Sequence, residues 1–227
     1  MADNLLQFRQ RIRRYLVELN KETSFWTDTF LNQLFNASYR RRSAQLIRAY
    51  EGWFVQTAYR DIEEDKSTYG FPDGVQRLQR VEILRSNGDL VPLERYERFA
   101  ETNPGESSAV GDQYYPTYRP FANGLILEPT PTEDITNGLR IEYAGLPTKL
   151  SGDSDVLHPS FPEIYDELLV LDTVIIAMAA EGIHEVGPVS AIIQLRNEYE
   201  MDFIAFTDQR TIARDFVDPF IPWYEDE

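Results

Sequence analysis

The stretch that decides the fold is residues 125–150, LILEPTPTEDITNGLRIEYAGLPTKL, which holds two apolar runs separated by residues that break regular structure. Residues 125–127 form a short apolar run, and residues 139–143 alternate apolar and polar side chains as a half-buried strand does. The two prolines between the runs disfavour a regular ladder, and Asn137-Gly138 readily adopts the positive φ of a tight turn. The stretch therefore predicts a β-hairpin that closes a β-rich region.

The N-terminal residues predict an amphipathic helix rather than a signal peptide, because no continuous apolar core is present. Asp3 or Asn4 can cap this helix. Its apolar side chains recur at intervals of three and four residues, at Leu5, Phe8, Ile12, Tyr15 or Leu16, and Leu19. Its arginines fall mostly on the other face. They are interpreted as a solvated surface or, alternatively, as contacts with an acidic neighbour or phosphate: Arg9, Arg11, Arg13 and Arg14.

A second helical pattern begins near residue 27 and can run to about Ile62. Because one helix of that length exceeds the usual globular range, a break is expected near residues 38–43 or at Gly52. A run of three arginines in this pattern is interpreted as a solvated or partner-facing patch, with direct DNA contact as the alternative: Arg40, Arg41 and Arg42.

Turn residues and short strands predict a β-rich region between this helix and the opening stretch. Residues 75–84 are predicted to form a strand, and residues 87–89 its turn into residues 90–93. Residues 93–100 are expected to form one or two short helical turns. Residues 101–118 are polar and rich in Gly, Pro and Ser, and their length is typical of a functional or mobile loop.

Two further helices are predicted after the opening stretch. Ser160, Pro162 and Glu163 form a strong helix start. Residues 168–180 are apolar nearly all round, so this helix is expected to be buried in its own core or against copies of itself. Gly187-Pro188 opens the last helix, whose one side carries Val189, Ile192, Ile193, Arg196, Tyr199 and Phe203.

Residues 207–227, TDQRTIARDFVDPFIPWYEDE, show neither a helical nor a strand period. Large apolar side chains are unfavourable in an exposed tail, so two interpretations stay open. The segment folds back onto its own subunit, or it is an extended arm that docks on another chain. The candidate contact residues of the arm are Asp215, Phe216, Pro219, Phe220, Ile221, Pro222, Trp223 and Tyr224.

Composition limits the chemistry that this chain can perform. Zero cysteines exclude disulfides and thiolate metal sites, and no apolar run reaches the roughly 18 residues that a membrane span needs. The formal charge is −16, and it is uneven, with +5 over residues 1–60 and −21 over the rest. A body this acidic repels phosphate over most of its surface and is a poor general binder of nucleic acid. We expect synthesis in the cytoplasm.

The sequence offers no defensible catalytic, cofactor or metal site. His158 and His184 are the only histidines, and no Ser/His/Asp arrangement can be built around them. The glycines do not form a phosphate-binding loop, and paired carboxylates such as Glu63 and Glu64 are expected by chance in an acidic chain. Residues 151–155 lack the later bidentate Glu of a calcium loop and are interpreted as a turn. We therefore expect that the protein is not an enzyme and binds no cofactor and no metal.

The order of several motifs resembles that of tailed-bacteriophage adaptor proteins, also called head-to-tail connector or head-completion proteins. The motifs are FWTD, FL and LFN within residues 25–36, LILEP at 125–129, LRIEY at 139–143, and LPTKL at 146–150 before an apolar helix. The resemblance covers about residues 5–205. It implies a helical bundle with an inserted β-domain, a ring of usually twelve copies under the portal, and no catalytic residue or cofactor.

These observations predict an α+β fold, in which a helical bundle carries an inserted β-rich domain, antiparallel and barrel- or sandwich-like, and an extended C-terminal arm. The expected divisions are residues 1–66, 67–150, 151–206 and 207–227. Contacts between subunits are expected at Arg40, Arg41, Arg42, Leu168, Leu171 and Ile175.

The expected function is that of a structural adaptor in the virion neck, assembled in the host cytoplasm. Its expected partners are copies of itself in a ring, the portal protein, which the arm contacts, and a downstream tail or neck protein. DNA is expected to pass through the ring without specific binding, and no membrane is involved. The alternatives are a tail-side ring component, such as a tail-tube or tail-completion protein, and a glycan-processing tail enzyme.

Overall fold

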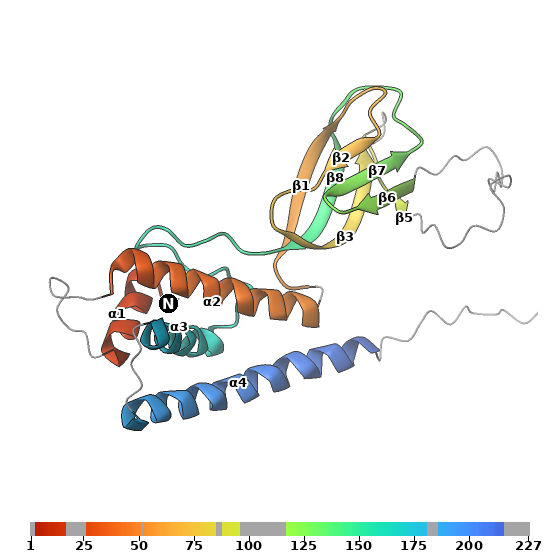
Figure 1. Cartoon of the computed structure of the whole chain (residues 1–227). Helices are drawn as coiled ribbons and strands as arrows, with labels where there is room; N and C mark the ends of the chain where they lie inside the picture. Colours follow the sequence, from red (N-terminus) through yellow and green to blue (C-terminus); the bar gives the residue numbers. More distant parts are fainter. Residues whose placement is uncertain are drawn as a thin grey trace, which may run out of the picture. The chain divides into compact units, whose positions relative to one another are not determined.

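The computed structural model describes residues 3–16, 26–50, 52–84, 88–95, 117–180 and 186–215 (Figure 1). The chain divides into two compact units. Met1–Phe54 and Leu146–Glu227 make up the helical unit, and Val55–Gly145 makes up the β unit. The described residues form four α-helices and two four-stranded sheets, and their strands close no barrel. The fold class predicted from the sequence, α+β, is confirmed.

Helix α1 spans Leu5–Tyr15 and begins where the sequence predicts. The side chain of Asn4 accepts a hydrogen bond from the Gln7 amide at 2.9 Å, and the Gln7 side chain accepts one from the Asn4 amide at 2.8 Å. This reciprocal pair satisfies two amides that a helix start leaves free. Phe8 and Ile12 are fully buried, as their spacing indicates.

Helix α2 spans Asp28–Ala49, and the Thr27 hydroxyl caps it by accepting from the Phe30 amide at 3.2 Å. It runs without a break through residues 38–43 and ends three residues before Gly52, the other place where a break was predicted. The prediction that helix could continue to Ile62 is wrong, because Val55–Ile62 forms strand β1. Phe54 has a φ of 55° and turns the chain. The backbone of β1 then forms hydrogen bonds with β8 instead of the hydrogen bonds that a helix makes within one segment.

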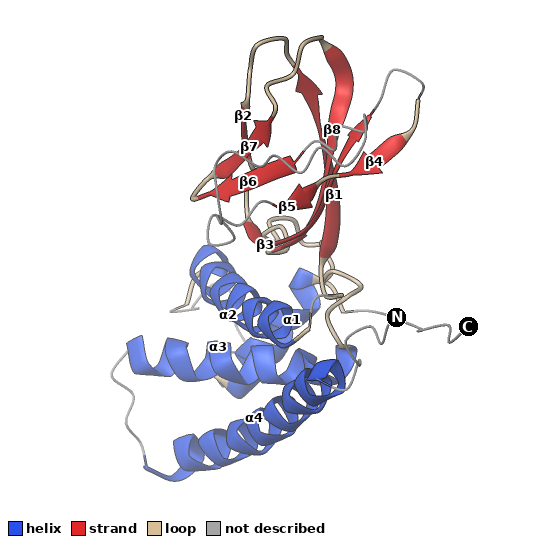
Figure 2. Cartoon of the chain, turned by 90° about the vertical axis from the view of Figure 1, so that its right-hand side faces the viewer, coloured by secondary structure: helices blue, strands red, loops and turns tan. Residues whose placement is uncertain are grey.

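The first sheet of the β unit is fully antiparallel, in the order β1–β8–β3–β4 (Figure 2). Strand β3, Val75–Leu84, has the predicted bounds. Strand β4, Leu90–Pro92, pairs with the end of β3 as the predicted turn requires. Strand β8, Ile135–Gly145, lies between β1 and β3.

The second sheet has the order β2–β7–β6–β5. Strands β2 (Thr68–Gly70), β7 (Gly124–Glu128) and β6 (Thr117–Phe121) pair antiparallel, and β5 (Glu94–Arg95) pairs parallel with β6. The helical turns expected over residues 93–100 are therefore wrong at β5, whose backbone bonds to a strand more than twenty residues away.

The two runs of the opening stretch are both strands, but they do not form the predicted hairpin. β7 belongs to one sheet and β8 to the other. Asn137, with a φ of 51°, lies inside β8 and donates its amide to Asp61 Oδ1 at 2.7 Å. A Cβ on Gly138 would lie 2.8 Å from Ile135 Cβ, so glycine is required there. Asn137-Gly138 is thus a bulge opposite β1, because the positive φ serves a bulge as well as a turn.

The core of the β unit draws on both sheets, which makes the unit sandwich-like. Its members include a residue from the end of the predicted 101–118 loop, Tyr118, which is buried in β6. Residues 101–116 lie outside the described residues. The buried core residues are Ile62, Tyr69, Val81, Leu93, Tyr118, Leu125, Leu127, Leu139, Ile141 and Tyr143.

Helix α3, Asp166–Ala180, is the centre of the helical unit (Figure 2). A short 3-10 turn, Glu163–Tyr165, leads into it, and it packs against α1, α2 and α4. Leu168 and Leu171 are 0% exposed. Of the two environments expected for this apolar helix, the structure shows burial in the core of its own subunit.

Helix α4 spans Val186–Asp215. The prediction that residues 207–215 are extended is wrong, because the helix continues nine residues past Phe206. These residues include good helix formers and no proline, and the first proline after α4 is Pro219. Residues 216–227, with all the aromatic and proline residues of the predicted arm, lie outside the described residues.

Candidate interaction surfaces of the helical unit

Arg42 does not face solvent or a partner, because it is 0% exposed beneath α3 and α4. Its Nε donates to Asp172 Oδ2 of α3 at 2.8 Å, and its Nη1 donates to Glu200 Oε1 of α4 at 2.9 Å. Its guanidinium also lies 5.5 Å from the centre of the Phe203 ring. The prediction of an inter-subunit or solvated role is therefore wrong for Arg42, since its charge needs buried partners.

Arg196 completes a cluster of two arginines and two carboxylates. Its Nε donates to Asp172 Oδ1 at 3.0 Å, and its Nη2 lies 2.9 Å from Glu200 Oε2. Burial alone would raise the pKa of Glu200, but the hydrogen bond and charge of Arg42, with Arg196 adding, lower it. The cluster therefore holds α2, α3 and α4 together as ionised groups.

The arginines of α1 also contact acidic neighbours rather than forming only a solvated surface. Arg9 is 5% exposed and pairs with Asp28 and Asp153. Arg11 pairs with Asp3 and Glu167. Of the two interpretations left open, the contact with an acidic neighbour holds for Arg9, Arg11 and Arg13, and Arg14 is exposed.

Asp166, at the start of α3, is a carboxylate in a poor environment for its charge. Its Oδ1 is buried and makes no hydrogen bond with the described residues. Burial raises the pKa of Asp166 to about 7, opposed by the charge of Arg11 and reinforced by three nearby carboxylates: Asp3, Glu163 and Glu167. This side chain changes its protonation near neutral pH.

Three arginines of α2 form no ion pair in the part of the chain that the structure describes. Arg41 and Arg48 are exposed, Arg40 is partly exposed, and the Nε of Arg40 is buried without a hydrogen-bond partner there. Seven residues separate Arg41 from Arg48, so about 10 Å of helix holds both on one side of α2. In a chain of formal charge −16, they form a cationic surface suited to an acidic partner.

Helix α4 exposes several large apolar side chains. Met201 is 71% exposed, Ile204 47% and Ile193 41%. The spacings between these residues keep them on one side of a helix. Exposed apolar side chains grouped on one side of a helix are typical of a surface that contacts another molecule.

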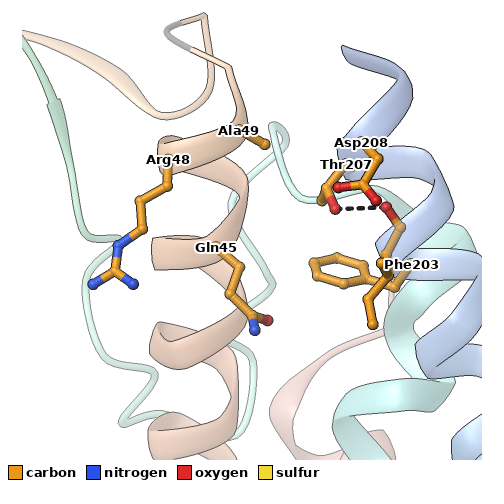
Figure 3. Close-up of a pocket in the computed structure, with 7 residues that line it drawn as sticks. Gln45, Arg48, Ala49, Phe203, Thr207 and Asp208 are labelled. Carbon is orange, nitrogen blue, oxygen red and sulfur yellow. Dashed lines mark hydrogen bonds between the residues drawn. The ribbon is translucent and has the colours of Figure 1, made fainter. Parts of the chain in front are cut away.

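A groove lies between α2 and α4 and has a volume of about 350 Å³ (Figure 3). Phe203 points into the gap between the helices, whereas the guanidinium of Arg48 lies on the side of α2 turned away from α4 (Figure 3). Phe203 is 1% exposed and forms the floor. The groove is lined by Gln45, Arg48, Ala49, Phe203, Ile204, Thr207 and Asp208.

The other sequence-predicted interface residues divide between core and surface. Leu168 and Leu171 fill the core of their own subunit, so the predicted inter-subunit contact is wrong for both, since a 0% exposed side chain offers no surface to a neighbour. Ile175 is partly exposed. In the predicted arm, Asp215 is the last residue of α4, and the remaining arm residues lie outside the described ranges.

Sequence reasoning missed the partners of Arg42, although one signal was present. Asp172 is the only charged residue between Leu168 and Ala180. A lone carboxylate in an apolar, buried helix requires a cation.

His158 has a structural role, because its Nδ1 accepts a hydrogen bond from the Ser160 amide at 3.1 Å.

Within residues 3–16, 26–50, 52–84, 88–95, 117–180 and 186–215, no three His, Cys, Asp or Glu side chains are grouped to hold a metal ion. No helix in those ranges is long and apolar enough to cross a membrane.

Comparison with known protein families gives a match over most of the chain. The model of the family described as SU10 adaptor protein matches residues 3–206, which include nearly all of both described units. No curated protein matches this chain. The family match ends before residues 207–227, so the predicted arm lies outside it.

Proposed function

This chain belongs to the SU10 adaptor protein family, and we propose that it forms a ring beneath the portal that connects the head of a tailed phage to its tail. The family makes it a bacteriophage structural adaptor. The match over residues 3–206 carries the proposal. The proposed neighbours are the portal protein on one side and a tail or neck protein on the other.

The proposed contacts between copies in the ring use side chains that remain exposed on the described part of the subunit. Repeated contact of one patch with a different patch on the next copy closes into a ring when the rotation permits. α4 offers its exposed apolar side, and α2 offers cationic side chains without ion pairs among the described residues. The proposed contact residues are Arg40, Arg41, Ile175, Ile193, Met201 and Ile204.

DNA passage is proposed to depend on the acidic charge of the subunit. Each copy carries a formal −16, so a ring of twelve would be strongly acidic. Phosphate is repelled by such a wall, and the effect fades beyond a Debye length of about 8 Å at physiological salt. DNA then slides through the channel without adhering. A channel lined mainly by arginine would contradict this.

The proposed portal contact is the segment from Asp215 to Tyr224. Pro219 and Pro222 restrict the chain and so lower the entropy lost when it docks. Phe220 and Trp223 are side chains of the kind that dominate interface energies. The flanking acidic residues steer the segment toward basic groups on the partner.

Native mass spectrometry of the chain mixed with purified portal tests the ring. The expected species is a portal carrying a full ring of copies, and single bound copies would contradict it. Pull-downs against portal and against tail proteins separate the connector from the tail-side ring component, since capture by tail proteins alone would favour the latter. A chain ending at Asp215 keeps α4 whole and is expected to fold normally but not to bind portal.

A further inference from the structure

The groove between α2 and α4 has an apolar floor and an exposed edge that no described segment covers. Phe203 lies beneath its volume of about 350 Å³, and Ile204 at its edge is 47% exposed. We propose that in the free subunit this groove holds the subunit's own C-terminal segment, residues 216–227, which leaves the groove when portal binds. The release on portal binding rests on the proposed function, whereas the occupation of the groove in the free subunit does not.

The position of α4 brings this segment within reach. Thr207 and Asp208 line the groove, and Asp215 ends the helix eight and seven residues later. At 1.5 Å per residue, the groove begins about 10 Å back along α4. Phe220 and Trp223 follow Asp215 by five and eight residues, and extended chain covers about 16 to 26 Å over those lengths. Both side chains can therefore return to the groove.

The chemistry of the segment fits the groove. Its prolines prevent it from continuing α4 or joining a sheet ladder, so its side chains must hold it in place. The volume over Phe203 accommodates an aromatic side chain such as that of Trp223.

Occupation of the groove would regulate assembly. The aromatic residues of the segment cannot contact the portal and the groove at once. Because the segment and groove belong to one chain, their effective concentration is high and independent of how much protein is present. The free subunit would therefore keep its portal-binding residues covered until portal competes for them.

A single dye can report on the groove, because the sequence contains no cysteine. We would place Asp208→Cys in the full-length chain, label it with bimane, which tryptophan quenches at short range, and compare it with the same chain carrying Trp223→Phe. The emission is expected to rise severalfold in the second chain. Both chains also carry Trp53→Phe, because the Trp53 ring lies 6.1 Å from that of Phe206 on α4 and would quench the label itself. Label on Gln33→Cys, an exposed residue of α2 distant from the groove, is expected to show no such rise.

A second variant fills the groove without changing the segment. Ala49→Phe in the labelled full-length chain should raise the emission to the Trp223→Phe level and increase the rate of portal binding, whereas Ala37→Phe on the exposed side of α2 should do neither. Circular dichroism confirms that each variant is folded. Equal emission with and without Trp223 would overturn the proposal, and quenching that grows with protein concentration would place the segment of a second copy there instead. If Trp223 quenches the label but Ala49→Phe binds portal at the same rate as the unsubstituted chain, only the release step would be overturned.

Discussion

The two units each contain a cluster of two arginines and two carboxylates, and the clusters differ in how far their arginines are buried. In the helical unit, Arg42 and Arg196 contact Asp172 and Glu200, and the Arg42 side chain is 0% exposed. In the β unit, four side chains contact one another along strands β3 and β8: Arg80, Glu82, Arg140 and Glu142. The Arg80 side chain there is 52% exposed.

The difference follows from what each cluster connects. The first joins three helices, and its Arg42 and Asp172 side chains are only 0% and 7% exposed, so water has little access to replace a lost partner there. The second lies on one face of a sheet, since Val81 and Ile141 point into the core and their neighbours Glu82 and Arg140 point the other way. The Glu82 side chain is itself only 4% exposed, but it keeps a second arginine if one is lost, so removal of one arginine is expected to cost less in the β unit than in the helical unit.

Arg42→Met should give the largest effect. It keeps an apolar stem but leaves the buried Asp172 and the partly exposed Glu200 with Arg196 as their remaining cation, and breaking such a buried pair costs about 3 to 5 kcal/mol. Urea denaturation followed by circular dichroism measures the loss of unfolding free energy. A loss below that of Arg140→Ala would break the comparison.

Asp166→Asn extends the comparison to a buried carboxylate without a good partner. Burial raises the pKa of Asp166 in the folded protein to about 7 from its ordinary value of 3.8. The neutral carboxyl therefore stabilises the fold fully below about pH 4, and this contribution is lost as pH rises through 7. The variant avoids the cost of burying the charge and should be more stable at pH 8 by about 1 to 2 kcal/mol, after allowance for solvent screening.

The pH dependence provides the control for Asp166→Asn. The advantage over wild type should shrink between pH 7 and pH 5, where Asp166 binds its proton. Thermal unfolding at pH 8, 7, 6 and 5 measures it. An advantage independent of pH would mean that the charge of Asp166 is not the cause.

Arg140→Ala tests the cluster of the β unit. Glu82 keeps Arg80 at 2.7 Å, so the expected loss is only about 0.5 to 1 kcal/mol and should fall further in high salt. Urea denaturation at low and high sodium chloride checks both statements. Glu82 is 3% exposed, so a large loss that salt does not change would show that Arg80 alone does not compensate its buried charge.

Arg41→Ala should give the smallest effect, although it is the sequence neighbour of Arg42. Arg41 is exposed and has no ion pair within the described residues, so its loss should change stability by less than about 0.5 kcal/mol. The same denaturation series measures this value. If Arg41→Ala matched Arg42→Met, burial would not be what separates the two arginines.

Local patterns predicted several elements correctly, and the reason is that their determinants are close in sequence. The cap of α1 needs only Asn4 and Gln7, and β3 shows its bounds in a run of residues that favour strand. The opening stretch shows the limit of such reasoning. β7 and β8 were recognisable as strands, but their partners, β2 and β6 for one and β1 and β3 for the other, are set by pairing across the chain.

The candidate interfaces show the same division. Arg40, Arg41 and Arg42 are indistinguishable as a sequence, and a helical period alone does not say which of them meets a carboxylate from α3 or α4. Asp172 was the one local sign that a buried cation was needed. Exposure of Ile193, Met201 and Ile204 likewise depends on which side of α4 the other helices cover.

The sequence by itself determined the acidic charge, the absence of cysteine chemistry, the positions of most helices and strands, and the resemblance to an adaptor family. These properties are sums over residues or depend on neighbours within a few positions. Only the tertiary structure decided that Val55–Ile62 is a strand, that residues 207–215 extend a helix, and that Arg42 is buried. Each of these depends on which distant groups meet, and on the free energy of burying or pairing them.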